Sequence, residues 1–314
     1  VTKSGFHHFT TGKIPEIDKR RLRVVLPAGS YKDNYIFVDG TRMMYNMEGK
    51  PVWYLPDVDK DQETIEQDIK MTTRGTITFI KGDNAYEIDF NGRVLWSGSR
   101  TASVTGNLSD TVGYIYHHEF TRLPNGHYMA LVSAADNGLR SELPVPVSGS
   151  PTVRSKRFFP DMQDGRIAEF DAGGNMVWEW HTSKYFHESD LSSLCLQHPD
   201  RRIDFHENSF FFFYKDSVIY LSMMGISRVL KISYPSGKVI GTYGNLYSAK
   251  DTVRKEAGPI DMRQTLHDLA QNDMYCRQHC CVRSRDGHLY VYNNNIETIP
   301  LKPVMRYAQL VKMK

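Results

Sequence analysis

Histidines recur at one position of a repeated pattern in this sequence, each just before a pair of predicted strands. A single such histidine would more often be a core imidazole bonded to backbone. An imidazole changes charge near neutral pH and offers a donor, an acceptor and a nucleophilic nitrogen. Its recurrence at matched positions therefore predicts one shared site. The candidates are His117 or His118, His206 and His279.

Each histidine stands in a short polar block that leads through a turn into an apolar strand. The blocks cover residues 117–126, 204–209 and 278–287. Carboxylates near the histidines are candidates for orienting a ring, although such acids more often cap turns. These acids are Glu119, Asp204 and Glu207.

A longer repeat surrounds these blocks and predicts the fold. In each copy two strands are joined by a glycine-containing turn, and an apolar strand with Trp or Tyr at its end follows. Two further short strands precede each pair, which makes a four-stranded unit. Such units in series are typical of a β-propeller. Copies occur at residues 35–54, 77–96, 167–180 and 229–243, and the hairpin at His279 begins a fifth.

We therefore expect an all-β protein, with a β-propeller domain at residues 34–314 and an unassigned N-terminal segment at 1–33. A β-sandwich of irregular strands is the alternative, but it does not explain the recurring turn followed by Trp. The strand that opens each propeller blade lines the central channel. Residues at the starts of these strands should then converge, which would bring the histidines together.

Long connections interrupt the regular pattern at residues 136–164, 182–203 and 246–278, and the last contains a helix-like segment at 261–272. Loops of this length inside a compact repeat often form lids or specificity elements. The fifth unit has only residues 306–311 for its outer pair. Because an open sheet edge is unfavourable, we expect further residues after Lys314.

Composition narrows the class of protein. The chain has 314 residues, of which 40% are hydrophobic and 24% charged, which is ordinary for a globular domain. The net charge of +3 and the lack of a long basic run give no sign of a nucleic-acid partner. No apolar run is long enough to span a membrane. Four cysteines do not suggest a disulfide framework: Cys195, Cys276, Cys280 and Cys281.

The ordered histidine blocks resemble those of the bacterial arylsulfate sulfotransferase family. That family pairs a His-His-Asp/Glu block with a D-W/F-x-H-x-N-S-like block and a Q-H-D-A block, in the order found here across residues 34–295. The resemblance implies a six-bladed propeller, of which about five blades are visible. It also implies transfer of a sulfuryl group from an aryl sulfate ester to a phenol, without a nucleotide sulfate donor or another cofactor. A periplasmic or secreted location is implied too, and an oligomer is compatible with it.

The resemblance further implies roles for individual residues. His279 would be the nucleophile that accepts the sulfuryl group. His206 and one of His117 and His118 would hold sulfate oxygens or act on the phenolic oxygen. Aromatic side chains in the long connections are candidates for gripping an aryl ring, namely Tyr185, Phe186 and Tyr247.

The sequence departs from the family pattern at two places. Met223-Met224 stands where relatives carry Ser-Arg, and Cys280-Cys281 stands where they carry Asp-Ala. A thioether does not replace a bidentate guanidinium that contacts sulfate. Arg228 follows nearby and is predicted to lie on the next strand. The departures support a second hypothesis, a catalytically silent propeller that binds aryl sulfates.

Metal binding is a third interpretation of the histidines. Three imidazoles with an open fourth position would suit a catalytic zinc ion in a lyase or hydrolase. Cys276, His279 and Cys280 are also close in sequence. However, the pattern Cys-x-x-His-Cys-Cys has no second pair of ligands, so a zinc knuckle is not predicted.

Overall fold

The structure is a computed structural model of the chain, and it divides into two compact units, residues 1–97 and 98–314. Several sequence features lie outside the described residues: the predicted helix at 261–272, Asp204, Cys195, Cys276 and the three candidate aromatic residues. The described residues are 22–58, 66–98, 101–103, 111–134, 142–144, 156–158, 164–182, 205–224, 228–244, 278–284, 287–294, 296–299, 302–305 and 309–313.

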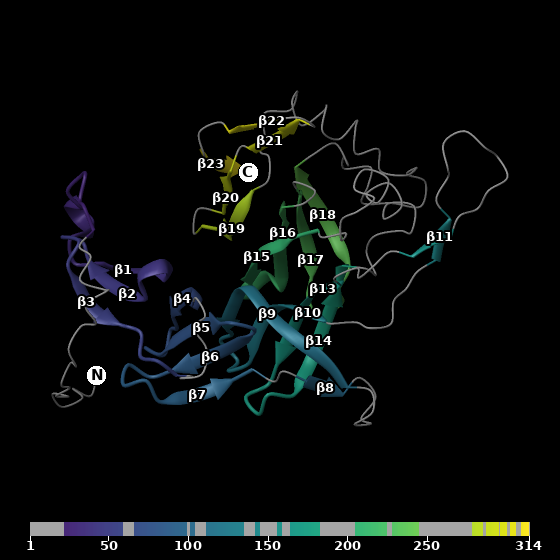
Figure 1. Ribbon diagram of the computed structural model, residues 1–314, viewed down its shortest axis with the longest axis horizontal. Helices are drawn as coiled ribbons and strands as arrows, with labels where there is room; N and C mark the ends of the chain where they lie inside the picture. Colours follow the sequence, from purple (N-terminus) through teal and green to yellow (C-terminus); the bar gives the residue numbers. More distant parts are fainter. Residues whose placement is uncertain are drawn as a thin grey trace. The chain divides into compact units, whose positions relative to one another are not determined.

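The all-β prediction is confirmed: across these residues the chain forms antiparallel sheets linked by turns and short 3₁₀ segments (Figure 1). The first unit contains a three-stranded sheet in the order β1-β2-β3 and a four-stranded sheet in the order β4-β5-β6-β7. Its elements are η2 (Gly29–Tyr31), β1 (Tyr35–Val38), η3 (Asp39–Thr41), β2 (Met43–Asn46), β3 (Pro51–Tyr54), β4 (Glu66–Met71), β5 (Ile77–Lys81), β6 (Asn84–Ile88) and β7 (Val94–Ser97).

The predicted glycine turns share one local structure. In the turn after β6, the side chain of Asp89 accepts hydrogen bonds from the backbone N–H groups of Asn91 and Arg93. Gly92 then adopts a φ of 84°, a conformation that glycine reaches without steric strain. The same pairing of an Asx side chain with a positive-φ glycine recurs at Asn46 with Gly49 and at Asp171 with Gly174.

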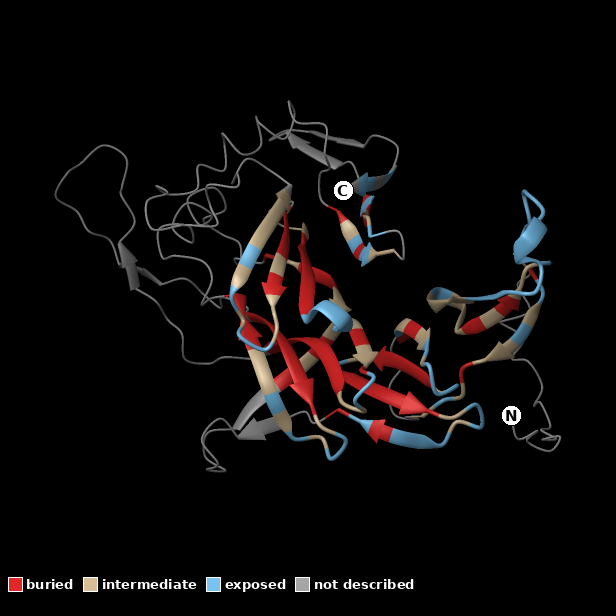
Figure 2. Cartoon of the chain, turned by 180° about the vertical axis from the view of Figure 1, so that it is seen from behind, coloured by how far each residue is buried: buried red, intermediate tan, exposed pale blue. Residues whose placement is uncertain are grey.

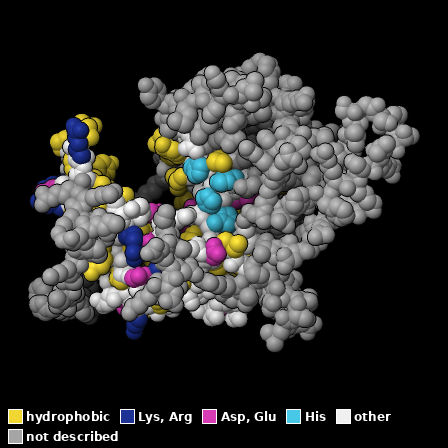
Figure 3. All heavy atoms as spheres, viewed as in Figure 1, with side chains coloured by type: hydrophobic (Ala, Val, Ile, Leu, Met, Phe, Trp, Pro, Cys, Tyr) yellow, Lys and Arg dark blue, Asp and Glu magenta, His cyan; other side chains and the backbone are white. Residues whose placement is uncertain are grey.

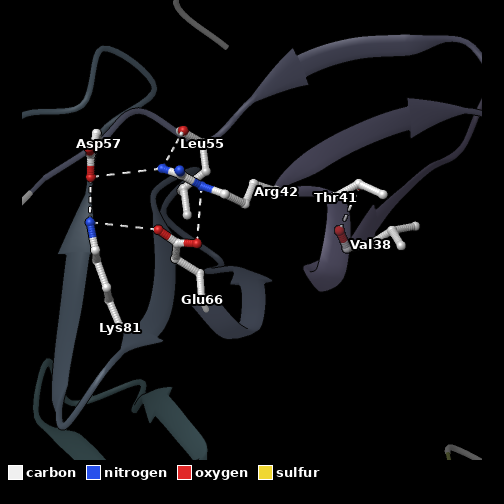
Figure 4. A network of polar contacts seen from close by, with 7 residues as sticks. All are labelled: Val38, Thr41, Arg42, Leu55, Asp57, Glu66 and Lys81. Atoms are coloured by element: carbon white, nitrogen blue, oxygen red, sulfur yellow. Dashed lines mark hydrogen bonds and ion pairs between the residues drawn. The ribbon is translucent and has the colours of Figure 1, made fainter. Parts of the chain in front are cut away.

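A charged network ties the elements of the first unit together (Figure 4). Glu66 and Lys81 are almost completely buried, and their charged atoms lie 3.8 Å apart. Arg42 Nε lies 3.0 Å from the Glu66 carboxylate, and Lys81 also contacts Asp57. Each buried charge therefore faces an opposite charge, as burial in a sheet core requires.

The second unit contains three larger sheets and two short hairpins. The sheet orders are β14-β13-β10-β9-β8, β15-β16-β17-β18 and β19-β20-β23, with β11-β12 and β21-β22 as hairpins. The strands are β8 (Thr101–Ser103), β9 (Thr111–Arg122), β10 (Tyr128–Ala134), β11 (Glu142–Pro144), β12 (Lys156–Phe158), β13 (Asp164–Phe170), β14 (Met176–His181), β15 (Glu207–Phe213), β16 (Val218–Met223), β17 (Arg228–Ser233), β18 (Val239–Gly244), β19 (His279–Arg283), β20 (Leu289–Asn293), β21 (Ile296–Ile299), β22 (Lys302–Met305) and β23 (Gln309–Met313), with η5 (Tyr214–Asp216).

The hairpin β11-β12 corrects the prediction that residues 136–164 are only a loop. Strands of three residues are too short to show an alternating pattern, which is why the sequence did not reveal them. The predicted outer strand of the last unit is present as β23, which pairs with β20 in antiparallel register.

The sheet β15–β18 is buried on both faces, which decides between the two predicted architectures. On one face Leu221 and Leu230 pack against Leu131 and Ile167 of the preceding sheet. On the other face Tyr220 and Val229 join a cluster with residues of the following sheet. Figure 2 shows the central strands of this unit buried along most of their length. Sheets stacked in this way are the blades of a propeller, whereas each sheet of a sandwich has one exposed face. The number of blades remains a prediction.

Candidate active site

A backbone irregularity occurs within β9, just before β15 and within β19, one in each of the three larger sheets of the second unit. His118, His206 and Cys280 all have φ between 53° and 57°, the left-handed region that non-glycine residues rarely occupy. Pairing registers shift beside these residues, which marks β-bulges. Bulges of this kind re-aim side chains. The histidines are therefore positioned by local distortions of otherwise regular strands.

The four predicted site histidines form a continuous chain of rings. The ring centroids of His117 and His118 are 5.1 Å apart, those of His118 and His206 are 5.0 Å apart, and those of His206 and His279 are 6.2 Å apart. All three contacts are edge-to-face. Figure 3 shows histidine side chains gathered in one patch. The structure thus brings together residues that are up to 162 positions apart, between 117 and 279.

His118 rather than His117 continues the chain of imidazoles. Nδ1 of His117 lies 2.9 Å from Nδ1 of His118, so one of the two nitrogens donates a proton to the other. The ring of His118 then contacts His206. His117 is therefore hydrogen-bonded to His118, with one proton between the two Nδ1 atoms.

His279 is held by Asn294, a residue that the sequence analysis did not single out. The side-chain nitrogen of Asn294 lies 2.6 Å from Nδ1 of His279. Asn294 directly follows β20, and in the antiparallel hairpin His279 pairs with Tyr292. The end of β20 therefore lies beside the start of β19. Hairpin register was the signal in the sequence that could have identified this contact.

Five hydrogen bonds, each with a side chain on at least one side, fasten the segment around His279 to the neighbouring sheet. Asn208 donates to the carbonyl of Gln278 at 2.7 Å, and Ser209 accepts from the N–H of Cys281 at 3.0 Å. The fully buried side chain of Gln278 donates to the hydroxyl of Ser222 at 3.1 Å and to the carbonyls of Met223 and Arg228 at 3.2 and 2.9 Å. The backbone of His279 is thus fixed on both sides.

Met223 and Met224, at the family's Ser-Arg position, both have structural contacts. Met223 is buried in the core between two sheets, and the N–H of Met224 donates to the carbonyl of His206 at 3.0 Å. Arg228 begins β17, which confirms its predicted place on the next strand, and it pairs with Met223. Its side chain is 0% exposed, so this guanidinium lies inside the protein.

Glu207, a candidate for orienting an imidazole, faces the sheet that precedes it. Its carboxylate accepts a hydrogen bond from the hydroxyl of Thr182. It also packs onto Gly165, where the carboxyl group leaves no room for a Cβ. This is an inter-sheet contact. Glu119 lies near Cys281, whose thiol pKa is raised well above its usual value by burial and further by Cys280 and Glu119.

The structure offers no support for the zinc interpretation within its described residues, where no three His, Cys, Asp or Glu side chains are grouped to hold a metal ion. Cys276, one of the possible ligands, lies outside them. In the same residues, no helix is long and apolar enough to cross a membrane.

Comparison with known proteins places the chain in a family. The sequence model of the Arylsulfotransferase (ASST) family matches residues 27–310. The chain belongs to the arylsulfotransferase family. This confirms the resemblance drawn from the histidine blocks and implies a transferase. No curated protein matches the sequence.

Several solved structures resemble the arylsulfotransferase chain at low identity. A protein of unknown function from Bacteroides caccae is 12% identical, with 85% of this chain and 68% of that chain covered and a TM-score of 0.43. A luciferin-regenerating enzyme is 11% identical, with 88% and 71% covered and a TM-score of 0.40. The Dos1 propeller is 10% identical, with 85% and 54% covered and a TM-score of 0.36.

Proposed function

We propose that this arylsulfotransferase moves a sulfuryl group from an aryl sulfate ester to a phenol through a sulfohistidine at His279. The observation that supports the proposal most is the chain of imidazoles, in which His118 and His206 lead to His279 through ring contacts of 5.0 and 6.2 Å. Such an array supplies a nucleophile, hydrogen-bond donors and a proton carrier within reach of one small ligand.

In the first half-reaction a bare ring nitrogen of His279 attacks sulfur, and the bond between sulfur and the aryl oxygen breaks. The departing phenolate takes a proton from a neighbouring imidazolium, His206 or His118. Donors on these rings also neutralise charge on the sulfate oxygens. The product is a phenol and a sulfohistidine.

In the second half-reaction a phenol enters and gives its proton to the imidazole that was left neutral. Its oxygen attacks sulfur and the bond between sulfur and His279 breaks, which restores the free histidine. The cycle consumes no cofactor, and the partners are a small aryl sulfate and a phenol. A periplasmic or secreted location belongs to this proposal.

The test is release of p-nitrophenol from p-nitrophenyl sulfate in the presence of phenol. We expect His279→Ala to abolish both release and the labelling of the protein by ³⁵S-sulfate ester, because no nucleophile remains. His288→Ala, in the same hairpin, is the matched control and should keep both. Labelling of the His279→Ala protein at wild-type level would contradict the proposal.

Met223 and Met224 favour a second candidate, a propeller that binds aryl sulfates without turning them over. Calorimetry separates the two: binding of p-nitrophenyl sulfate with no release of p-nitrophenol supports the silent protein. Turnover measured in the presence of a chelator tests the third candidate, a metal-dependent hydrolase or lyase. Turnover that is lost in EDTA and restored by zinc would support that third function.

A further inference from the structure

The contact between Asn294 and His279 has a chemical consequence for the site. A neutral imidazole carries one proton, on either Nδ1 or Nε2, and the partner of one nitrogen fixes the state of the other. Nδ1 of His279 is 2.6 Å from the Asn294 amide, a short hydrogen bond. Nδ1 is therefore occupied, and a sulfur atom cannot approach it from that side.

The amide of Asn294 can make this contact in two ways. With its nitrogen facing Nδ1, as placed in the structure, the amide donates and the ring proton is on Nε2. With the amide turned by half a rotation, its oxygen accepts from an Nδ1–H and Nε2 is bare. The first arrangement makes Nε2 a donor suited to a sulfate oxygen. The second makes Nε2 a nucleophile.

We propose that Asn294 is a positioning residue that keeps Nδ1 of His279 out of the reaction and directs the sulfuryl group to Nε2. The inference rests on the proposed sulfuryl transfer. In the attacking state the amide oxygen accepts from Nδ1–H. The Nε2 lone pair forms the bond to sulfur, the bond to the aryl oxygen breaks, and the phenolate leaves with a proton from a neighbouring imidazolium. Nδ1–H stays in place, so the sulfo-imidazolium keeps its proton on Nδ1 and donates a hydrogen bond to the Asn294 oxygen.

Other residues near His279 fix its backbone, whereas Asn294 contacts its ring. Asn208 and Ser209 already fix the backbone on either side, through the carbonyl of Gln278 and the N–H of Cys281. These contacts place the α-carbon, but they do not choose between the two ring nitrogens. Asn294 acts on the ring itself.

Two variants of Asn294 distinguish an effect on the tautomer of His279 from an effect on folding. In Asn294→Asp the carboxylate only accepts, so the ring should be held with the proton on Nδ1 and Nε2 bare. In Asn294→Leu neither contact is possible. Asn125→Ala changes an exposed asparagine whose oxygen accepts from the N–H of His127 at a turn, and it serves as the control.

The first readout is the ¹⁵N NMR spectrum of the histidine rings in the ligand-free protein, with His279 assigned from a His279→Gln sample. We expect Asn294→Asp to show a protonated Nδ1, Asn294→Leu to lose a fixed tautomer, and Asn125→Ala to match the wild type. The second readout is the position of the sulfuryl group after trapping with p-nitrophenyl sulfate and digestion at alkaline pH.

We expect the trapped group on Nε2 in the wild type and in Asn294→Asp. Asn294→Leu should be labelled at least about tenfold more slowly, a typical effect of removing an orienting partner, and on both nitrogens. A sulfuryl group on Nδ1 of the wild type, or unchanged ring signals and labelling in Asn294→Leu, would overturn the inference. Absence of any label on wild-type His279 would instead defeat the proposed function, while the ring signals would still test the role of Asn294.

Discussion

Cys280 and Cys281 are neighbours in sequence with opposite environments. Cys280 is exposed, has a φ of 55° and adjoins the proposed nucleophile His279. Cys281 is fully buried, and its side chain packs with apolar residues of β16 and β20. Burial raises the pKa of the Cys281 thiol, with smaller contributions from Cys280 and Glu119. Since the thiolate is the reactive form, the two residues should differ in reactivity.

Iodoacetamide should therefore modify Cys280 and spare Cys281 in the folded protein at pH 8. Peptide mass spectrometry measures the two sites separately, and the denatured protein, in which both should react, is the control. Because Cys280 adjoins His279, its alkylation should also slow the release of p-nitrophenol. Equal modification of the two cysteines in the folded protein would show that Cys281 is not protected by burial.

Between sheets, Glu169 joins three elements of the second unit. Its buried carboxylate lies 2.7 Å from Nδ1 of His127, which precedes β10, and it accepts a hydrogen bond of 2.6 Å from the hydroxyl of Tyr234, which follows β17. Burial raises the pKa of Tyr234, and the hydrogen bond to Glu169 and the charge of Glu169 raise it further. The neutral phenol is therefore the form that the fold stabilises.

Tyr234→Phe should lower the free energy of unfolding by about 1.5–3 kcal/mol near neutral pH, the usual range for a hydrogen bond to a charged group. The pKa of Tyr234 is higher in the folded than in the unfolded protein, so its contribution is complete below the unfolded pKa of about 10 and is lost as pH rises above it. The difference in free energy of unfolding between the wild type and Tyr234→Phe should therefore decrease as pH rises.

Urea unfolding of both proteins at pH 8 and at pH values above 10 measures this difference. Tyr214→Phe is the control, because Tyr214 is exposed and its replacement leaves the hydrogen bond between Tyr234 and Glu169 in place. A difference in free energy of unfolding between the wild type and Tyr234→Phe that increases with pH would contradict the assigned role of the Glu169 contact.

Strands and turns were predictable from sequence because they depend on local pattern. Short apolar runs between glycine-containing turns indicated the strands, and Asp89 with Gly92 shows how an Asx side chain and a glycine fix each repeated turn. The bulges were not predictable. His118 and His206 adopt left-handed backbone conformations that local sequence disfavours, so packing of the sheets must impose them.

The meeting of the four histidine rings was predictable from the sequence, but their individual contacts were not. Histidines at matched positions indicated that the rings would meet, since blade-opening strands converge. The partner of His279 depends on the register of one hairpin, and the anchoring by Asn208 and Gln278 depends on contacts between sheets. Glu207 was one candidate for orienting an imidazole, but its carboxylate contacts Thr182. Side-chain direction at a bulge decides such contacts.

At the scale of the whole molecule, the two compact units differ in what they contain. The imidazole chain lies entirely within residues 98–314, and the buried charged network lies within residues 1–97. The side chains of Glu66 and Lys81 are 2% and 3% exposed, so removal of either charge leaves the other in the protein interior.

Lys81→Met should lower the stability of the first unit by about 3–5 kcal/mol, because it leaves the Glu66 carboxylate buried with one cation, Arg42, at its edge. The double variant Lys81→Met with Glu66→Gln should recover part of this loss. Denaturant unfolding followed by the separate ¹⁹F NMR signals of fluorotryptophan at Trp53 and Trp96 reports on this unit. A double variant as unstable as Lys81→Met would show that the carboxylate is not the source of the loss.

The fastening of His279 to its neighbouring sheet also has a consequence for the order in which the protein assembles. Asn208 reaches the carbonyl of Gln278 across 70 residues, and Ser209 reaches the N–H of Cys281 across 72. Non-local contacts of this kind form later than local hairpins, because the entropy of closing the loop is lost before the contact is gained. The fourth imidazole therefore joins the other three only after β15–β18 has formed, and catalytic competence would be among the last properties gained as the chain leaves the ribosome.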